Sequence, residues 1–191
     1  MSWYNEAIFY HIYPLGLTGA PKENDYGTPV SRLNTLIPWI SHIKEIGCTA
    51  LYIGPLFESV GHGYETTDYK KLDSRLGTNE DLKDFVEVCH ENQIKVIFDG
   101  VFNHTGRDFF AFKDIQQNRE HSRYLNWYCN VNFGGNNEYN DGFSYIRKFR
   151  IISAMSFDSG YLNLMWMESV WMQQMCLILI SCTLCAVPQK K

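Results

Sequence analysis

The sequence lacks several features that would place it quickly in a class. Its 191 residues carry a net charge of −4, so there is no excess of basic residues for phosphate backbones and nucleic-acid binding is not expected. No positively charged segment followed by an apolar one stands at the N-terminus, which argues against a secretory signal. The six cysteines stand at irregular spacing. This pattern is typical of reduced intracellular thiols, and we expect a cytoplasmic location.

Charge is also scarce toward the C-terminus. Of the 17 basic and 21 acidic residues, only four lie in the last 41 positions, at Asp158, Glu168, Lys190 and Lys191. The same segment holds five of the six methionines and three of the six cysteines. This change of composition indicates that the last part of the chain has to be interpreted separately from the first 150 residues.

The first 150 residues contain an alternation of strand and helix patterns. Apolar runs predict three buried strands, at residues 7–14, 49–54 and 95–101. One-sided apolar faces between them predict a helix capped by Asn34 and ended by Gly47, and a second helix capped by Thr78. This order predicts a parallel sheet covered by helices, with the carboxyl ends of the strands along one edge. Loops are expected at 58–77 and 105–145.

Two polar clusters follow these strands. Asp99, Asn103 and His104 come directly after the third strand and could bind sugar hydroxyls, a hard cation or a guanidinium group. The alternative is that Asp99 only caps a turn and that His104 is a surface residue. After the second strand, a glycine between His62 and Tyr64 would let the tyrosine ring project and stack on a pyranose. Because both loops leave the same edge of the sheet, we expect these side chains to converge.

Four ordered strings carry a specific resemblance: FYHIYP at 9–14, HGYETTDY at 62–69, LGTNEDL at 76–82 and DGVFNH at 99–104. They resemble the N-terminal part of the α-amylase family of glycoside hydrolases, most closely its neopullulanase and cyclomaltodextrinase-like branch. The resemblance covers roughly residues 3–145. It implies an α/β fold in which residues 1–104 form the first three β/α units of a (β/α)8 TIM barrel. Residues 105–145 would be a small domain inserted after strand three, and the barrel would be incomplete.

The resemblance also implies roles for the polar residues. Tyr64 would stack on the sugar ring beside the scissile bond, His104 would bond its hydroxyls, and His62 would lie nearby. Asp99 would hold an arginine rather than act as a catalyst. Asn103 matches a position that ligates calcium in many members, although this branch often lacks the ion. The implied partner is an α-glucan oligosaccharide, with hydrolysis or transglycosylation at α-1,4 or α-1,6 bonds both open, and members of the branch are often dimeric.

The chain departs from this family at the catalytic centre. Retaining glycosidases use two carboxyl groups about 5–5.5 Å apart, one as nucleophile and one as acid/base. In the resembling family these groups follow the fourth and fifth strands, and the fourth strand carries the string Gly-x-Arg-x-Asp. No such string occurs in the 191 residues. We therefore assign no catalytic residue and expect no turnover by this chain alone.

The last segment carries the missing string in another reading frame. Met and Trp have one codon each, so residues 165–167 are encoded by ATG-TGG-ATG, and the codon of Glu168 begins with the bases GA. Read from the third base of each codon, these bases spell Val-Asp-Gly whatever the wobble, and Trp171-Met172 gives a further Asp. The positions between them allow Ile-Arg-Leu, which completes V-D-G-I-R-L-D. We interpret 146–191 as an out-of-frame tail without a native fold, caused by a deletion or sequence error near Tyr145.

Two other interpretations of the chain remain open. Residues 175–187 form an apolar stretch that faintly resembles a membrane anchor, but a spanning helix needs about 20 residues, so membrane tethering is not expected. The chain could also be a non-catalytic glucan-binding module that uses Tyr64 and His104.

Overall fold

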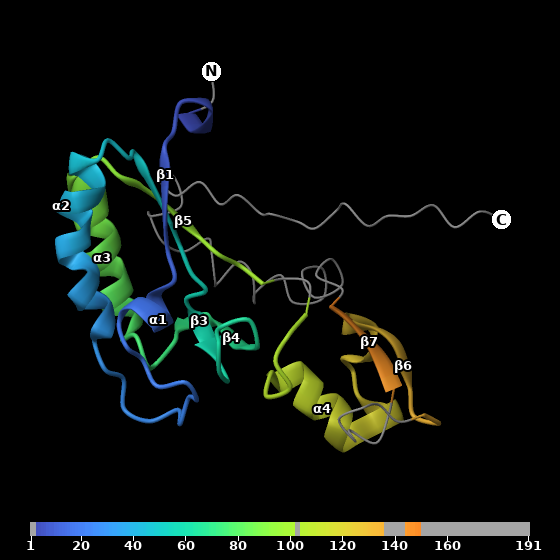
Figure 1. Ribbon diagram of the computed structural model, residues 1–191. Coiled ribbons are helices and arrows are strands. Elements are labelled where there is room, and N and C mark those ends of the chain that lie inside the picture. Colours follow the sequence, from blue (N-terminus) through green and yellow to red (C-terminus); the bar gives the residue numbers. More distant parts are fainter. Residues whose placement is uncertain (1–2, 102–103, 136–143, 150–191) are drawn as a thin grey trace.

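The computed structural model describes residues 3–101, 104–135 and 144–149. Its centre is a parallel sheet with the strand order β1-β2-β5 (Figure 1). The strands are β1 (Phe9–Ile12), β2 (Ala50–Ile53) and β5 (Lys95–Phe98). Ile53 of β2 lies opposite Ile12 on one side and Phe98 on the other. The three strands and their parallel pairing are as the sequence predicted.

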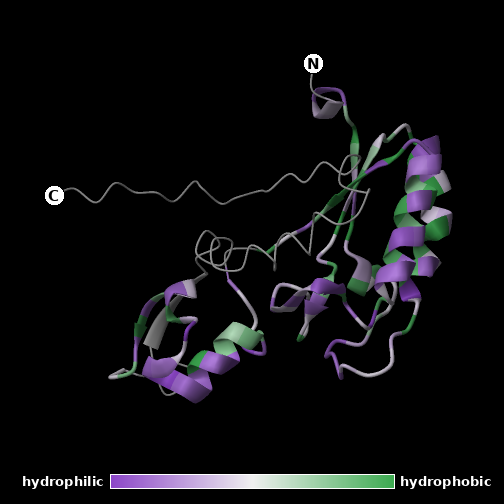
Figure 2. Ribbon diagram, turned by 180° about the vertical axis from the view of Figure 1, so that it is seen from behind, coloured by the Kyte–Doolittle hydropathy of each residue, from purple (hydrophilic) through white to green (hydrophobic). Residues whose placement is uncertain are grey.

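Helices α2 (Ile37–Glu45) and α3 (Asn79–Glu91) lie together against one face of this sheet (Figure 1). Both helices interleave hydrophobic and hydrophilic residues, as Figure 2 shows. Their apolar side chains share one buried cluster with the strands, which includes Ile40, Ile43, Leu51, Ile53, Phe85 and Val86. Each such side chain stabilises the fold by about 1.5–3 kcal/mol when fully buried. This cluster is therefore the main core of the described sheet.

The two helices begin differently. Thr78 caps α3 as predicted: its Oγ1 accepts a hydrogen bond from the Asp81 amide at 3.2 Å, and Asp81 Oδ2 accepts one from the Thr78 amide at 2.7 Å. The prediction that Asn34 caps the first helix is wrong. Arg32–Leu36 forms a 3₁₀ helix (η2) that runs directly into α2. Asn34 Nδ2 instead donates to Asp81 Oδ1 at 3.1 Å, so this side chain joins η2 to the start of α3.

The region 58–77, predicted as a loop, contains an antiparallel hairpin. Its strands are β3 (Phe57–Ser59) and β4 (Thr66–Leu72), and their pairing has register shifts on both sides of Glu58. Buried residues of β4 fall at every third position rather than every second. The sequence of β4 therefore lacks the alternation by which strands are identified.

The region 105–145, predicted as irregular, also contains regular elements. They are α4 (Phe110–Asn118), the antiparallel pair β6 (Tyr128–Asn132) and β7 (Ser144–Phe149), and the 3₁₀ turns η3 (Arg119–His121) and η4 (Leu125–Trp127). A second, largely aromatic cluster packs this region against the hairpin through Phe57, Tyr69, Phe109, Phe112, Trp127 and Tyr128. Two short elements lie toward the N-terminus: η1 (Trp3–Asn5) and α1 (Pro14–Leu17).

Several predictions concern residues outside the described ranges. Asn103 is one of them, and the tail from residue 150 onward, with its apolar stretch at 175–187, is another. The described strand β7 crosses the predicted boundary at residue 145. Among the described residues, no helix has the length and apolar character required to cross a membrane.

Candidate functional site

The loops that follow the three parallel strands leave from one edge of the sheet. The Gly54 amide donates to the Ile12 carbonyl at 3.2 Å, and the Asp99 amide donates to the Ile53 carbonyl at 3.0 Å. The ladder of hydrogen bonds thus continues one residue beyond β2 and β5. Gly54 and Asp99 therefore occupy equivalent positions at the carboxyl ends of neighbouring strands. In parallel α/β sheets, ligands bind at this edge.

The charge of Asp99 acts on two tyrosine phenols. Burial, followed by the charge of Asp99 and a hydrogen bond to its carboxylate, raises the pKa of Tyr52 to about 12. Burial and then the same two effects of Asp99 also raise the pKa of Tyr64. Both phenols therefore remain neutral donors at physiological pH. The structure thus brings together Tyr64 and Asp99, two of the residues that the sequence singled out.

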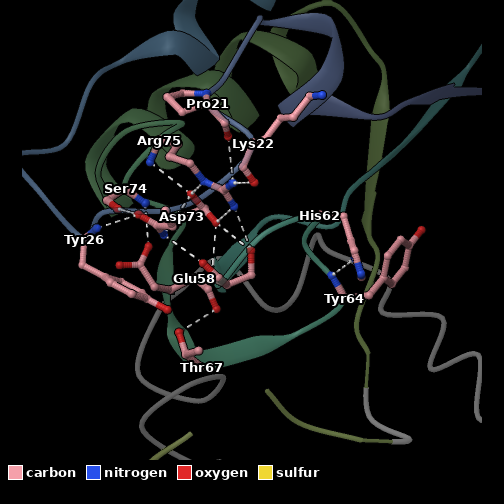
Figure 3. Close-up of polar contacts among 12 residues, drawn as sticks. Pro21, Lys22, Tyr26, Glu58, His62, Tyr64, Thr67, Asp73, Ser74 and Arg75 are labelled. Carbon is pink, nitrogen blue, oxygen red and sulfur yellow. Dashed lines mark hydrogen bonds and ion pairs between the residues drawn. The ribbon is translucent and has the colours of Figure 1, made fainter. Parts of the chain in front are cut away.

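His62 holds the turn that carries Tyr64. The Tyr64 amide donates to His62 Nδ1 at 3.3 Å, while His62 Nε2 lies 2.6 Å from Glu65 Oε1. This pattern places the imidazole proton on Nε2, because Nδ1 acts as an acceptor. The hydroxyl of Tyr13 donates to the His62 carbonyl at 3.0 Å and connects the turn to the loop after β1. Figure 3 shows the His62 and Tyr64 rings next to each other, with their centroids 5.7 Å apart.

Gly63 has a conformation that requires glycine. Its φ is +99°, and an added Cβ would lie 2.2 Å from Pro55 Cγ and 3.3 Å from Leu15 Cδ1. The turn therefore presses directly on Pro55, and the next side chain, Tyr64, projects outward with 41% of its surface exposed. An exposed aromatic ring beside hydrogen-bonding groups suits a ligand with one apolar and one polar face, such as a sugar ring.

His104 lies beyond Asp99 on the segment that follows β5. Its carbonyl accepts a hydrogen bond from the Tyr69 hydroxyl at 3.2 Å, and the same hydroxyl donates to the Val101 carbonyl at 2.5 Å. Tyr69 of β4 thus fixes the backbone that carries His104. The neighbouring Asn103 is outside the described residues. Within the described ranges, no group of three or more His, Cys, Asp or Glu residues is arranged to hold a metal ion.

A second carboxylate, Asp73, was not among the predicted residues. Asp73 is completely buried, and Arg75 is 4% exposed. They form a two-pronged ion pair, with Arg75 Nε 2.8 Å from Oδ1 and Nη2 2.7 Å from Oδ2 (Figure 3). Arg75 Nη1 donates to the carbonyls of Pro21 at 2.9 Å and Lys22 at 3.2 Å, and Ser59 Oγ donates to Asp73 Oδ2 at 2.9 Å. The pair therefore ties the loop after β1 to the hairpin.

Glu58 and Asn24 extend this network. Glu58 Oε2 accepts from the Ser74 amide and Oε1 from Lys71 Nζ, each at 2.6 Å. Asn24 Nδ2 donates to the Ser59 carbonyl at 2.9 Å, and Asn24 Oδ1 accepts from Ser74 Oγ at 3.0 Å. A buried polar network with these partners specifies one conformation of the chain. The network therefore holds the segment around residues 21–24 against the β3–β4 hairpin and the turn after it.

Two neighbours of Tyr64 were not among the residues predicted from the sequence. Tyr52 is half-buried, whereas Leu51 and Ile53 on either side of it are fully buried. Successive side chains of a strand point to opposite faces, so Tyr52 faces away from the helices. Its position was counted only as part of an apolar run, and a separate assignment of the two strand faces could have found it. Tyr13 was likewise counted as the end of the first strand.

A family model and the curated relatives of this chain indicate the same family. Residues 22–160 match the family model described as the alpha amylase catalytic domain. The chain is 36% identical over 140 residues to a cyclomaltodextrinase from Thermoanaerobacter pseudethanolicus, and 34% identical over 145 residues to neopullulanase 2 from Thermoactinomyces vulgaris. Each alignment covers 66% of this chain and 24% of the relative. The chain thus spans about a quarter of the length of these curated relatives.

Solved structures give the same result. A cyclic alpha-maltosyl-(1→6)-maltose hydrolase from Arthrobacter globiformis matches with a TM-score of 0.66 and 26% identity, over 85% of this chain and 41% of that one. A cyclomaltodextrinase matches with a TM-score of 0.55 and 33% identity, over 66% of this chain and 24% of that one.

Proposed function

Because the chain belongs to the α-amylase catalytic-domain family, we propose that it carries part of the catalytic domain of a retaining glycoside hydrolase acting on α-glucans. Relatives named cyclomaltodextrinase and neopullulanase support this substrate class. The observation that carries the proposal is the exposed ring of Tyr64, on the turn that Gly63 and His62 fix after the carboxyl end of β2. The described residues supply the sugar-binding side of the site.

Each predicted site residue has a role in this proposal. Tyr64 stacks on the sugar ring, and His104 bonds its hydroxyls. His62 holds the turn of Tyr64, as its hydrogen bond to the Tyr64 amide supports. Asp99 is structural and not catalytic. Calcium at Asn103 remains part of the proposal as an optional ion.

The fold of the proposed enzyme is a (β/α)8 barrel. β1, β2 and β5, with α2 and α3 on one face, correspond to its first three β/α units, which residues 1–104 supply. Residues 105–145 correspond to a domain inserted after the third barrel strand. The aromatic cluster that joins α4 and β6 to the hairpin supports this arrangement, because it is separate from the core cluster of the sheet.

The 191-residue chain has no glycosidase turnover in this proposal, because its sequence contains no Gly-x-Arg-x-Asp string. The V-D-G-I-R-L-D string hidden in the second frame supports a frameshift near Tyr145. Sequencing the underlying DNA from codon 140 onward tests this directly. If the bases cannot spell the hidden string, the frameshift interpretation is wrong. If the purified chain releases reducing sugar from maltodextrin, the proposed inactivity is wrong.

Binding tests the sugar-binding half of the proposal. Isothermal titration of the full chain with maltohexaose should show saturable binding, and Tyr64→Ala should weaken it by roughly tenfold or more, as loss of an aromatic anchor does. Tyr4→Ala is the matched control, since Tyr4 is similarly exposed at 48% but lies away from this edge of the sheet, in η1. Equal binding by wild type and Tyr64→Ala would remove Tyr64 from the site. If the frame-restored chain also lacked turnover, a non-catalytic glucan-binding module would be the better assignment.

A further inference from the structure

Glu65 follows Tyr64 on the hairpin turn, and its backbone is fixed from two sides. Its carbonyl accepts a hydrogen bond from the Val60 amide at 3.3 Å. An added Cβ on Gly106 would lie only 2.5 Å from the same carbonyl oxygen, and the Gly106 amide donates to the Thr66 carbonyl at 2.8 Å. The hairpin and the segment beyond β5 therefore hold the backbone of Glu65 without involving its carboxylate.

The carboxylate of Glu65 is directed at the imidazole of His62. Its Oε1 lies 2.6 Å from His62 Nε2. The other oxygen, Oε2, is buried and has no hydrogen-bond partner in the part of the chain that the structure describes. A buried carboxylate oxygen without a partner costs free energy. The fold therefore gains little stability from a carboxylate at this position, which favours a role in the site.

The imidazole of His62 connects this carboxylate to the backbone of Tyr64. The His62 side chain is 63% exposed, so packing alone does not fix its orientation. Its Nδ1 accepts a hydrogen bond from the Tyr64 amide at 3.3 Å, which requires the ring proton to be on Nε2. The hydrogen bond of one ring nitrogen determines the state of the other. By accepting from Nε2, Glu65 favours the tautomer and the orientation in which Nδ1 binds the Tyr64 amide.

We propose that Glu65 is a positioning residue of the sugar-binding site: its carboxylate orients the His62 imidazole, and the imidazole holds the turn from which the Tyr64 ring projects. The contribution to sugar binding rests on the proposed function, whereas the orientation of the imidazole does not. A turn that is held in one conformation in advance loses less conformational entropy when a ligand binds. Glu65 thereby contributes to affinity through His62, without contact with the sugar.

Titration of the full chain with maltohexaose tests the role in binding. Glu65→Leu removes the acceptor and should weaken binding by roughly three- to tenfold, which corresponds to the cost of ordering one further side chain. Glu65→Gln keeps an oxygen that can accept from Nε2 and should weaken binding less than Glu65→Leu. In a His62→Ala background, Glu65→Leu should have no further effect, because Glu65 acts through the imidazole. Glu6→Leu, at an exposed position before β1, should bind as wild type.

A second readout needs no sugar. NMR of the full chain with isotope-labelled histidine nitrogens reports the tautomer of His62, and His62→Ala assigns the signals. In mildly alkaline buffer, where histidine is neutral, the wild-type signals should be those of one tautomer with the proton on Nε2. Glu65→Leu should shift them toward the average of both tautomers, and the Tyr64 amide proton should then exchange faster with solvent. Glu65→Gln should keep the wild-type signals.

Urea unfolding separates a positioning role from a structural one. Because Oε2 is buried without a described partner, Glu65→Leu should leave the urea midpoint unchanged or raise it while binding falls. A lower midpoint, together with His62 signals and binding like those of wild type, would make Glu65 a structural residue and would overturn the proposal.

The remaining outcomes separate this proposal from the proposed function. The positioning role would be wrong if Glu65→Leu left the His62 signals unmoved, or if it weakened binding further in the His62→Ala background. If the wild-type chain binds no maltohexaose, the proposed function is wrong, and the His62 signals still decide whether Glu65 orients the imidazole. Averaged His62 signals together with a binding loss that disappears in the His62→Ala background would establish both.

Discussion

Asp73 and Asp99 both follow strands of neighbouring parts of the fold, but their surroundings are opposite. Asp73 is completely buried and bonded on both oxygens by the guanidinium of Arg75. Asp99 stands at the carboxyl edge of the sheet, where its charge raises the pKa of the Tyr52 and Tyr64 phenols in addition to their burial. A guanidinium neutralises a carboxylate, whereas a phenol donates a hydrogen bond without supplying positive charge. The group next to each carboxylate therefore decides its role. A buried guanidinium makes Asp73 part of the structural core, whereas Asp99 keeps a charge that no described cation neutralises.

The largest expected loss of stability comes from removing the cation of the buried Asp73–Arg75 pair. Arg75→Met should destabilise the chain by about 3–5 kcal/mol, because it leaves Asp73 buried without its counter-charge. Urea unfolding followed by circular dichroism measures this loss. Lys113→Met, which removes the exposed partner of the exposed Asp108, should cost about 1 kcal/mol or less. Equal effects of the two variants would mean that the Asp73–Arg75 pair does not organise the loops.

Tyr64→Ala should give the reverse result. We expect maltohexaose binding to fall by roughly tenfold, with the free energy of unfolding changed by no more than about 0.5 kcal/mol, because the ring is largely exposed. Parallel titration calorimetry and urea unfolding of one preparation measure both quantities. A loss of stability as large as that of Arg75→Met would mean that Tyr64 stabilises the fold instead of forming part of a binding surface.

Asp81 is an intermediate case, since it is half-buried and accepts several hydrogen bonds. Partial burial acts to raise its pKa, but hydrogen bonds from Thr78, Ser31 and Asn34 bring it below 3.8. Thr78→Ala should cost about 1 kcal/mol at neutral pH, as loss of a helix cap does. A carboxyl pKa lowered by folding stabilises above about 3.8, and this stabilisation disappears as pH falls through the lower folded value.

The difference between wild type and Thr78→Ala should therefore shrink in acid, as urea unfolding at several pH values would show. Thr35→Ala is the control, because the Thr35 hydroxyl bonds only to the Arg32 carbonyl within η2 among its described contacts. A constant difference down to the lowest pH would mean that the capping box does not depend on the Asp81 carboxylate.

The smallest expected effect lies at alkaline pH. Folding raises the pKa of Tyr52 from 10 to about 12, so the stabilisation from its neutral phenol is complete below pH 10 and is lost as pH rises through 12. Wild type should lose stability over this interval more steeply than Asp99→Asn, in which the shift is smaller. Urea midpoints across the interval measure the two slopes. Parallel curves would remove Asp99 as the partner of Tyr52.

The sheet was predictable because its signals are local and strong. The apolar runs of β1, β2 and β5 and the Thr78 capping box each depend on residues close together in the sequence. The hairpin and the elements of 105–145 were not, because their stability comes from contacts between distant aromatic residues such as Phe57 and Phe109. Asn34 illustrates the same limit, since its hydrogen bond goes to Asp81 in a different helix.

The positions of several candidate residues were predictable, but the residues that they contact were not. His62, Tyr64 and Asp99 were identified from their places after strands, and the structure brings them to one edge. Tyr52 was not, because its role depends on which face of β2 it occupies. The Asp73–Arg75 pair was not either, because two residues of opposite charge near a turn are most often solvated. Only the packing of the loop after β1 shows that this pair is buried.

The hydroxyl of Tyr69 has a mechanical consequence. By bonding to the carbonyls of both Val101 and His104, it couples the strand β4 to the segment beyond β5. If a ligand displaced His104, the hydrogen bonds of Tyr69 would pass this displacement to the hairpin. The segment that carries His104 and the turn that carries Tyr64 would then move together.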